Sequence, residues 1–406
     1  MPLDSVELLQ QLIAIPSVNP LGQDAAAAGI CGETRLTDFL QGVCERLGWR
    51  WLRQRVHPGR ENLLALIPGG RELQLWDVHQ DTVGVDGMTI DPFGGEVRDG
   101  RVYGRGACDD KGPMAAMIAA LSRPNDPSSH RPTIVLALPV NEECGFTGAT
   151  ALCDLWHPER RGAHETSGTI TAEELFPRIP DLAIVAEPTG LNVIVAHQGM
   201  VRWRCETIGR AAHSSRPGEG VNAIYAMGRV AQAIEAYQAR LVAGPEHPLC
   251  GRPAVSVTTI HGGVGINTIP DRTTVTIDRR VSPGENPSDA YADVVRFVAE
   301  HARLGDARVE HEPPFMKSFG LSVAHNHQLA ARLERLVEST GRVCQQLGAP
   351  WGTDGAAFSA AGVPTVVFGP GSVHQAHTAD EFIDIVELQR GTDLFEQIAR
   401  GGLGSG

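Results

Sequence analysis

The sequence has no long apolar run, no basic run and no closely spaced pair of cysteines. Its apolar runs are too short to span a bilayer, and no basic segment followed by an apolar one begins the chain, so we expect neither a membrane segment nor a secretory leader. A net charge of -13 without a basic, aromatic-rich patch argues against nucleic acid as a partner. The eight cysteines are scattered and form no Cys-x-x-Cys pair, which favours reduced thiols and a cytoplasmic location.

The composition is that of a globular protein, and its 406 residues exceed what one core usually holds. Short apolar runs alternate with helical patterns before residue 193 and after residue 311, as in an α/β layer with a buried sheet. Between them the pattern is strand-helix-strand-strand-helix with one polar sheet face, which predicts a small α+β domain. We therefore expect an α/β domain formed by 1–192 and 312–406, with 193–311 inserted into it.

An acidic pair lies in the Gly-rich stretch Gly104–Gly112, downstream of His79-Gln80-Asp81 and before an expected helix over 113–121. A carboxylate in such a loop can bridge two cations, while the glycines let the backbone turn tightly around them. A loop with a solvated Asp-Asp pair is the alternative interpretation of this stretch taken alone.

Side chains typical of metal ligands occur at five strand ends or loops. They are His79, Asp109, the pair Glu142-Glu143, Glu187 and His377. Taken singly, a histidine can be a satisfied surface residue, an acidic pair can begin a helix, and Glu187 before a proline can begin a turn. Their shared placement favours a metal site instead. Imidazole and carboxylate donors suit zinc, cobalt or manganese, and two ions about 3.5–4 Å apart would need one shared carboxylate. Cys108 and Cys144 each neighbour a better oxygen donor, so we interpret them as packed residues.

Several spaced motifs resemble one known family. They are H-Q-D-T-V (79–83), D-P-F-G-G-E-V (91–97), G-R-G-A-C-D-D-K-G (104–112), N-E-E-C-G (141–145), A-E-P-T (186–189) and G-R-A-A-H-S-S-R-P (209–217). In this order, and over nearly the whole chain, they resemble the M20-type zinc-dependent aminoacylase/carboxypeptidase superfamily, which includes acetylornithine deacetylase and succinyl-diaminopimelate desuccinylase. The resemblance implies a zinc-exopeptidase-like three-layer catalytic domain, an inserted ferredoxin-like dimerisation domain and a homodimer.

The resemblance also assigns the metal ligands. It implies two divalent ions, with Asp109 bridging them, His79 and Glu187 completing one site, and Glu143 and His377 completing the other. It further implies a cis peptide bond after Asp109. His374 competes with His377 for the last ligand position, but the acidic pair at 380–381 follows His377 as it does in the family.

Catalytic and substrate-binding roles follow from the same resemblance. Glu142 would be the general base, and Asp81 would lie behind the first ligand histidine and hold its tautomer. His213, in the inserted domain, would stabilise the oxyanion, and Asn267 is a further candidate for substrate binding. Arg280 aligns with the family's arginine that binds the substrate carboxylate, a role that suits a guanidinium because it can form two parallel hydrogen bonds with a carboxylate. A solvated charge on a sheet face is the alternative for Arg280.

These assignments predict a metal-dependent amidohydrolase that cleaves the amide of a small N-acyl amino acid with a metal-activated water. Glu187 and the stretch 369–372 are similar to the deacylase branch. A carboxypeptidase or dipeptidase acting on short peptides stays open, as does a non-catalytic binding protein on this fold. The chain departs from the family at Asp77, at Val78 in place of glycine, and at Asn141 in place of the common aspartate. None of these departures removes a ligand, so they bear on the substrate.

Overall fold

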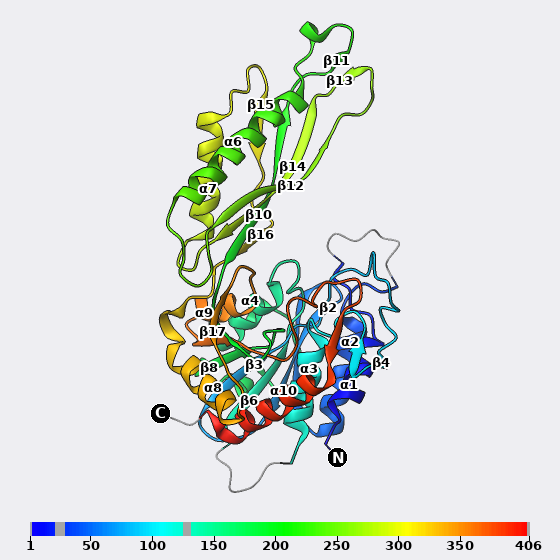
Figure 1. The fold of residues 1–406 in the computed structure, drawn as a ribbon, viewed down its shortest axis with the longest axis vertical. Helices are drawn as coiled ribbons and strands as arrows, with labels where there is room; N and C mark the ends of the chain where they lie inside the picture. Colours follow the sequence, from blue (N-terminus) through cyan, green and yellow to red (C-terminus); the bar gives the residue numbers. More distant parts are fainter. Residues whose placement is uncertain (1, 21–28, 125–130, 404–406) are drawn as a thin grey trace. The chain divides into compact units, whose positions relative to one another are not determined.

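The structure, a computed structural model, describes residues 2–20, 29–124 and 131–403. The chain forms two compact units (Figure 1). The first comprises the residues up to Val195, Ser322–Leu347 and the chain from Thr353 onward, and the second comprises Ala196–Leu321 and Gly348–Gly352. The expected insertion ended at residue 311, but β16 (Met316–Ser318) pairs with β10 (Gly199–Ile208) and keeps the chain in the second unit.

A nine-stranded sheet in the order β17-β9-β18-β8-β3-β6-β2-β1-β7 forms the centre of the first unit. Its strands are β1 (Arg50–His57), β2 (Arg60–Ile67), β3 (Leu73–Asp77), β6 (Thr133–Leu138), β7 (Thr166–Gly168), β8 (Leu182–Val185), β9 (Val193–His197), β17 (Gln346–Ala349) and β18 (Thr365–Val367). Strands β18, β8, β3 and β6 are mutually parallel neighbours, whereas β2, β1 and β7 continue antiparallel. Strands β3 and β8 are buried throughout, as parallel strands covered on both faces are.

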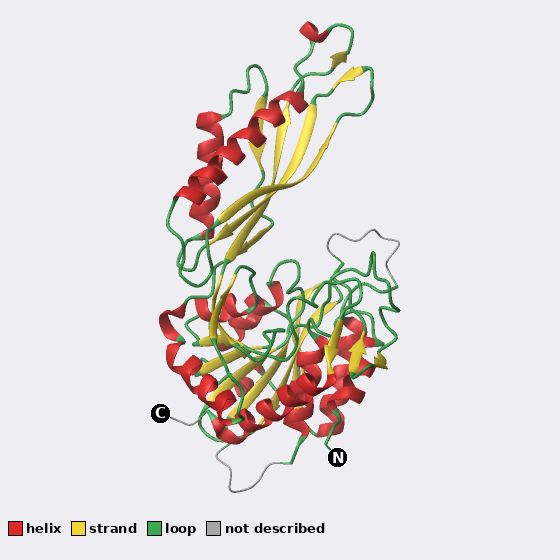
Figure 2. Ribbon diagram, in the orientation of Figure 1, coloured by secondary structure: helices red, strands yellow, loops and turns green. Residues whose placement is uncertain are grey.

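Helices cover both faces of this sheet (Figure 2). They are α1 (Ser5–Ile13), α2 (Thr34–Leu47), α3 (Lys111–Ser122), α4 (Thr147–Cys153), α5 (Ala172–Leu175), α8 (His327–Ser339), α9 (Gly355–Ala360) and α10 (Ile385–Gln397). Helices α1, α2, α3, α8 and α10 share one apolar core with Trp76, whose ring centroid lies 5.5 Å from that of Phe395. Helices α4 and α9 contact each other. A smaller sheet joins β4 (Glu96–Arg98), β5 (Arg101–Tyr103) and β19 (Phe382–Asp384), so the segment before β19 lies beside the loop after β5.

The second unit has an antiparallel sheet in the order β12-β14-β10-β15, with β16 also paired to β10. Its elements are α6 (Ala223–Ala243), β12 (Ala254–Gly262), β14 (Arg272–Val281), α7 (Pro287–His301) and β15 (Arg308–His311), and the short strands β11 (Ala212–His213) and β13 (Thr268–Ile269) pair with each other. Val201, Trp203 and Cys205 of β10 pack in the apolar core that includes residues of α6 and α7, whereas Arg204 is exposed, as the alternation in the sequence predicts. Among the residues described, no helix is both long and apolar enough to cross a membrane.

Candidate metal centre

The expected metal ligands converge where the parallel strands of the first unit end. His79 follows β3, the pair Glu142-Glu143 follows β6, and Glu187 follows β8. Asp109 lies in the loop between β5 and α3, and His377 lies in the loop after β18. The carboxyl ends of neighbouring parallel strands form one edge, which is where open α/β sheets bind their ligands.

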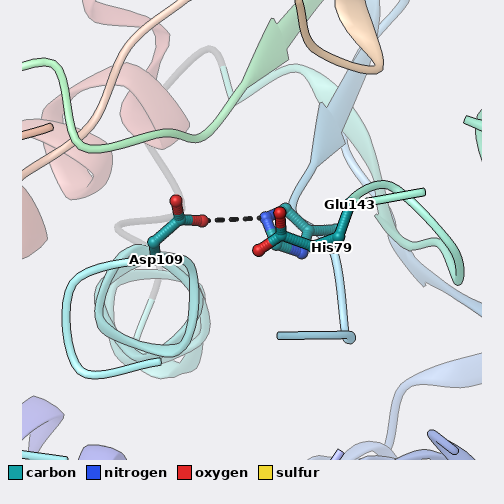
Figure 3. A group of neighbouring side chains, drawn as sticks. All are labelled: His79, Asp109 and Glu143. Atoms are coloured by element: carbon teal, nitrogen blue, oxygen red, sulfur yellow. Dashed lines mark hydrogen bonds and ion pairs between the residues drawn. The ribbon is translucent and has the colours of Figure 1, made fainter. Parts of the chain in front are cut away.

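Asp109 lies between two imidazoles. Its Oδ1 is 3.1 Å from His79 Nε2, and its Oδ2 is 3.3 Å from His377 Nε2. Glu143 Oε1 lies 3.3 Å from the same His377 nitrogen. Figure 3 shows Asp109 and Glu143 next to the ring of His79. A carboxylate with one oxygen facing each imidazole has the arrangement that a ligand bridging two cations needs.

A second group joins His79 to Glu142 and Glu187. The ligand atoms of these three residues lie within 4.8 Å of one another, as do those of His79, Asp109 and Glu143. The donors are therefore carboxylate oxygens and imidazole nitrogens, a set that fits zinc, cobalt or manganese. Four carboxylates this close together repel one another, and two divalent cations would neutralise them.

The neighbouring charges and burial shift the pKa values of these groups. Burial raises the pKa of Glu142 well above its usual range. Burial acts in the same direction on Asp109, but hydrogen bonds from His377 and His79 outweigh it and lower the pKa of Asp109. The hydrogen bonds to Asp109 and Glu143 raise the pKa of His377 to about 10. Because a metal ligand must be deprotonated, cation binding at this centre must release protons.

Asp81 contacts both His79 and the acidic pair, but not in the way expected. His79 Nδ1 donates to the backbone carbonyl of Asp81 at 2.8 Å, whereas the Asp81 carboxylate lies 3.7 Å from that nitrogen. The carboxylate instead accepts the backbone N–H groups of Glu142 (3.0 Å) and Glu143 (3.1 Å). The carbonyl thus fixes the His79 tautomer and leaves Nε2 free to ligate, while the carboxylate fixes the turn after β6.

Two other donors near these ligands in the sequence are Cys108 and His374. The Cys108 thiol donates to the carbonyl of Ser372 at 3.3 Å, and burial raises its pKa well above the usual range. His374 is exposed, whereas His377, three residues later, contacts the carboxylates. The peptide bond between Asp109 and Asp110 is cis, as the resemblance implies.

The chain matches the model of the peptidase family M20/M25/M40 over residues 75–401. It belongs to this family. Acetylornithine deacetylase from Proteus mirabilis is 30% identical over 402 residues, which cover 97% of this chain and 95% of the relative. The same enzyme from Salmonella paratyphi B is 30% identical over 407 residues, covering 97% and 96% of the two chains.

Solved structures of the M20 family share the fold. An M20 metallo-carboxypeptidase from Sulfolobus solfataricus superposes with a TM-score of 0.74 at 15% identity, covering 98% of this chain and 99% of that one. Human carnosine dipeptidase 1 gives a TM-score of 0.72 at 17% identity, with 99% and 96% covered. The predicted α/β fold is therefore confirmed, and the chain is a metal-dependent amide hydrolase.

The three M20-type residues expected from the inserted domain lie in the second unit, in two separate places. His213 is on β11, and the N–H of Ser214 donates to the carbonyl of Asn267 at 2.9 Å, so His213 and Asn267 are close neighbours. Arg280 lies near the other end of β14, and its Nε is 3.0 Å from Asp278 Oδ1. Arg280 is therefore a partly buried, paired residue of the sheet rather than a solvated charge.

Glu381, which the sequence marks only as a residue following His377, holds the backbone around Asp109. One carboxylate oxygen accepts the N–H groups of Cys108 (2.9 Å) and Asp109 (3.0 Å). The other accepts the N–H of Gly106 at 3.1 Å and the guanidinium of Arg105 at 2.6 Å. Since Glu381 and Arg105 are almost fully buried, this carboxylate fixes the loop that carries the candidate bridging ligand.

We expect Glu381→Gln to weaken metal binding and to destabilise the fold. The amide would set an N–H group against backbone N–H groups and leave Arg105 without its counter-charge, and breaking a buried pair costs about 3–5 kcal/mol. Elemental analysis and denaturant unfolding measure the two effects, with Asp380→Asn, at an exposed neighbour, as the matched control. Unchanged metal content in Glu381→Gln would refute this positioning role.

Proposed function

We propose that the chain removes the acyl group from an N-acyl amino acid, as an acetylornithine deacetylase-like or desuccinylase-like enzyme. The observation that carries the proposal is the 30% identity with acetylornithine deacetylases over 97% of the chain. A peptidase of the same family is the alternative, but the named peptidase structures are 15–17% identical and speak for the fold alone.

The contacts support a specific division of the ligands. His377 contacts Asp109 and Glu143, so these three would hold one ion, most suitably zinc. His79 contacts the other oxygen of Asp109 and is grouped with Glu187, so these would hold the second ion. Cobalt or manganese would suit the same donors. When bound, the two cations would polarise the amide carbonyl and acidify the attacking water.

Glu142 is the proposed general base. It lies beside His79 and Glu187, and the Asp81 carboxylate fixes its backbone. Burial raises its pKa, which makes it a better proton acceptor than an exposed carboxylate. Glu142 would take the proton of the attacking water and then pass it to the leaving amine. The bond that breaks is the amide C–N bond, and the products are a carboxylate and a free amino group.

The substrate groups proposed in the second unit are too far apart to act together from one chain. His213 and Asn267 lie beyond the Arg272 end of β14. Arg280 lies eight residues further along this strand, which at about 3.3 Å per residue places it about 26 Å from Arg272. This distance exceeds the length of an N-acyl amino acid. We therefore propose that Arg280 and the His213–Asn267 pair serve different active sites, and that His213 acts on the site of a second copy, as the family resemblance implies.

An unpaired edge in the second unit supports a homodimer. Strand β12 ends the sheet order, and Ile260 on it is exposed. The loop that follows carries Val264, which is 89% exposed, and Ile266, which is fully exposed. Open strand edges and exposed apolar side chains mark surfaces that pair with another chain. We propose that two copies join through this surface.

A substrate panel tests the proposed function. Purified enzyme supplied with zinc or cobalt should release free amine from Nα-acetylornithine and related Nα-acyl amino acids faster than from dipeptides, measured as kcat/KM. The panel should include N-succinyl-diaminopimelate, and a parallel Glu142→Ala preparation excludes contaminating activity. Faster hydrolysis of dipeptides would replace the proposal by the peptidase alternative.

Complementation between inactive variants tests the shared site. Glu142→Ala chains mixed with His213→Ala chains form mixed dimers in which one site has an intact Glu142 from its own chain and an intact His213 from the other. Random exchange makes half the dimers mixed, and half their sites whole, so roughly a quarter of the wild-type activity should return.

Subunit exchange is verified separately, by mass spectrometry of differently tagged chains. A mixture of Glu142→Ala with a second inactive first-unit variant, Glu143→Ala, is the matched control, because each chain supplies both residues to its own site and every site of a mixed dimer therefore has one defect. In that mixture each chain carries its own defect, so no activity should return. Absence of recovery in the His213 mixture despite exchange would contradict action across the dimer.

A further inference from the structure

Asn141 forms a left-handed turn directly before the acidic pair. Its φ is +65°, a conformation that asparagine tolerates better than most other residues. The turn lies between the end of β6 and Glu142, so the conformation of this one residue sets the direction in which Glu142 and Glu143 leave the strand. The groups that hold Asn141 therefore act on both carboxylates.

A buried ion pair holds this turn. Glu33, immediately before α2, is 0% exposed, and Arg60, the first residue of β2, is 7% exposed. Arg60 forks onto both carboxylate oxygens of Glu33, with its Nε at 2.7 Å from Oε2. The pair then reaches Asn141 from two sides: Glu33 Oε1 accepts the backbone N–H of Asn141 at 3.2 Å, and Arg60 Nη1 donates to Asn141 Oδ1 at 3.2 Å.

Two further contacts complete the network around Asn141. Asn19 Nδ2 donates to Asn141 Oδ1 at 3.0 Å and to Asp81 Oδ2 at 2.7 Å, and Asn141 Nδ2 donates to Thr147 Oγ1 at 2.9 Å. Arg60 is thus near two carboxylates, those of Glu33 and Asp81, before any charge at position 141 is counted. A neutral side chain at 141 avoids a third carboxylate beside one guanidinium.

We propose that Arg60, Glu33 and Asn141 are positioning residues that fix the direction of the Glu142-Glu143 pair, and that Glu33 supplies the counter-charge of Arg60 because residue 141 is asparagine. The inference rests on the proposed role of Glu142 as the base. It predicts that one carboxylate hydrogen-bonded to Arg60 is required and that this carboxylate can come from either position 33 or position 141.

Three variants test this exchange of charge. Glu33→Gln removes the only carboxylate that is hydrogen-bonded to Arg60 among the described residues, and Asn141→Asp adds a surplus one. Each should lower kcat by ~10-fold or more, because small displacements of catalytic groups can cost up to ~10²-fold. The double variant Glu33→Gln/Asn141→Asp restores one charge, so its kcat should exceed that of Glu33→Gln and approach that of the wild type. KM should change little, and because the same turn carries Glu143, the metal content of each variant is measured and kcat is compared at full metal loading.

The control is Glu61→Gln, at the residue after Arg60 on β2, which removes an ion pair with Arg53 of β1 (3.2 Å) and should leave kcat unchanged. A folded, metal-loaded double variant no faster than Glu33→Gln would overturn the proposal. A lower melting temperature with unchanged kcat in Glu33→Gln would also overturn it, because the pair would then be merely structural. All ratios are measured on whichever amide the wild type hydrolyses, so failure of the N-acyl amino acid proposal is seen separately, in the wild-type substrate panel.

Discussion

Glu142→Ala should keep both metal ions and lose about 10²–10⁴-fold in kcat, the usual contribution of a general base. The Glu142 side chain lies beside His79 and Glu187, and the backbone N–H of Glu142 donates to the Asp81 carboxylate. Removing the Glu142 carboxylate therefore leaves the turn in place. The proposed ligands of both cations remain in this variant. The loss should therefore fall on turnover and not on metal binding.

The neighbouring variant Glu143→Ala provides the matched comparison. Glu143 contacts His377, with which it would share one cation, so its removal should lower the metal content to about one ion per chain. Elemental analysis of the two variants, beside their kcat values, separates the roles. If Glu142→Ala loses metal and Glu143→Ala keeps it, the two glutamates have been assigned the wrong way round.

Asp109→Asn should reduce metal binding at both positions at once. Its two oxygens face His79 and His377 separately, so a single amide nitrogen in place of an oxygen removes a donor from one cation and weakens the charge seen by the other. Activity should fall with the lost metal, and excess metal should restore it only in part. No other single ligand substitution is expected to affect both ions equally.

Asp110→Asn is the control for Asp109→Asn, since it makes the same change one residue later. Asp110 is fully buried but belongs to neither ligand group found among the described residues. The Asp110→Asn variant should therefore bind nearly two ions per chain. The reverse pattern, with metal lost from Asp110→Asn and kept by Asp109→Asn, would move the bridge by one residue.

The candidate ligands could be predicted from the sequence because each carries a local mark. His79, Glu142-Glu143 and Glu187 each follow an apolar run, and a run of that kind ends at the ligand-binding edge of a parallel sheet. The alternation around Trp203 likewise predicts a half-buried strand, which the structure confirms. Local periodicity is enough where a residue's role depends on where its own strand ends.

Contacts between distant segments could not be predicted in this way. Arg60 and Asn141 are 81 residues apart, and nothing in either local pattern marks their hydrogen bond. The two functions of Asp81 depend on the path of the backbone, which directs its carbonyl to one partner and its carboxylate to others. The sequence pattern predicted an inserted segment that ends at residue 311, whereas the second unit continues to Leu321. The strand that extends it, β16, has only three residues, too few for a visible alternation.

The central claim is that this chain hydrolyses amides with two cations held by Asp109 and its neighbours. Its most direct test is a titration of chelator-treated enzyme with zinc, in which bound metal and the hydrolysis of Nα-acetylornithine are measured on the same samples. We predict no hydrolysis by the metal-free chain and a rate that rises with bound metal to a plateau at two ions per chain. Hydrolysis at the full rate by metal-free enzyme would contradict the account.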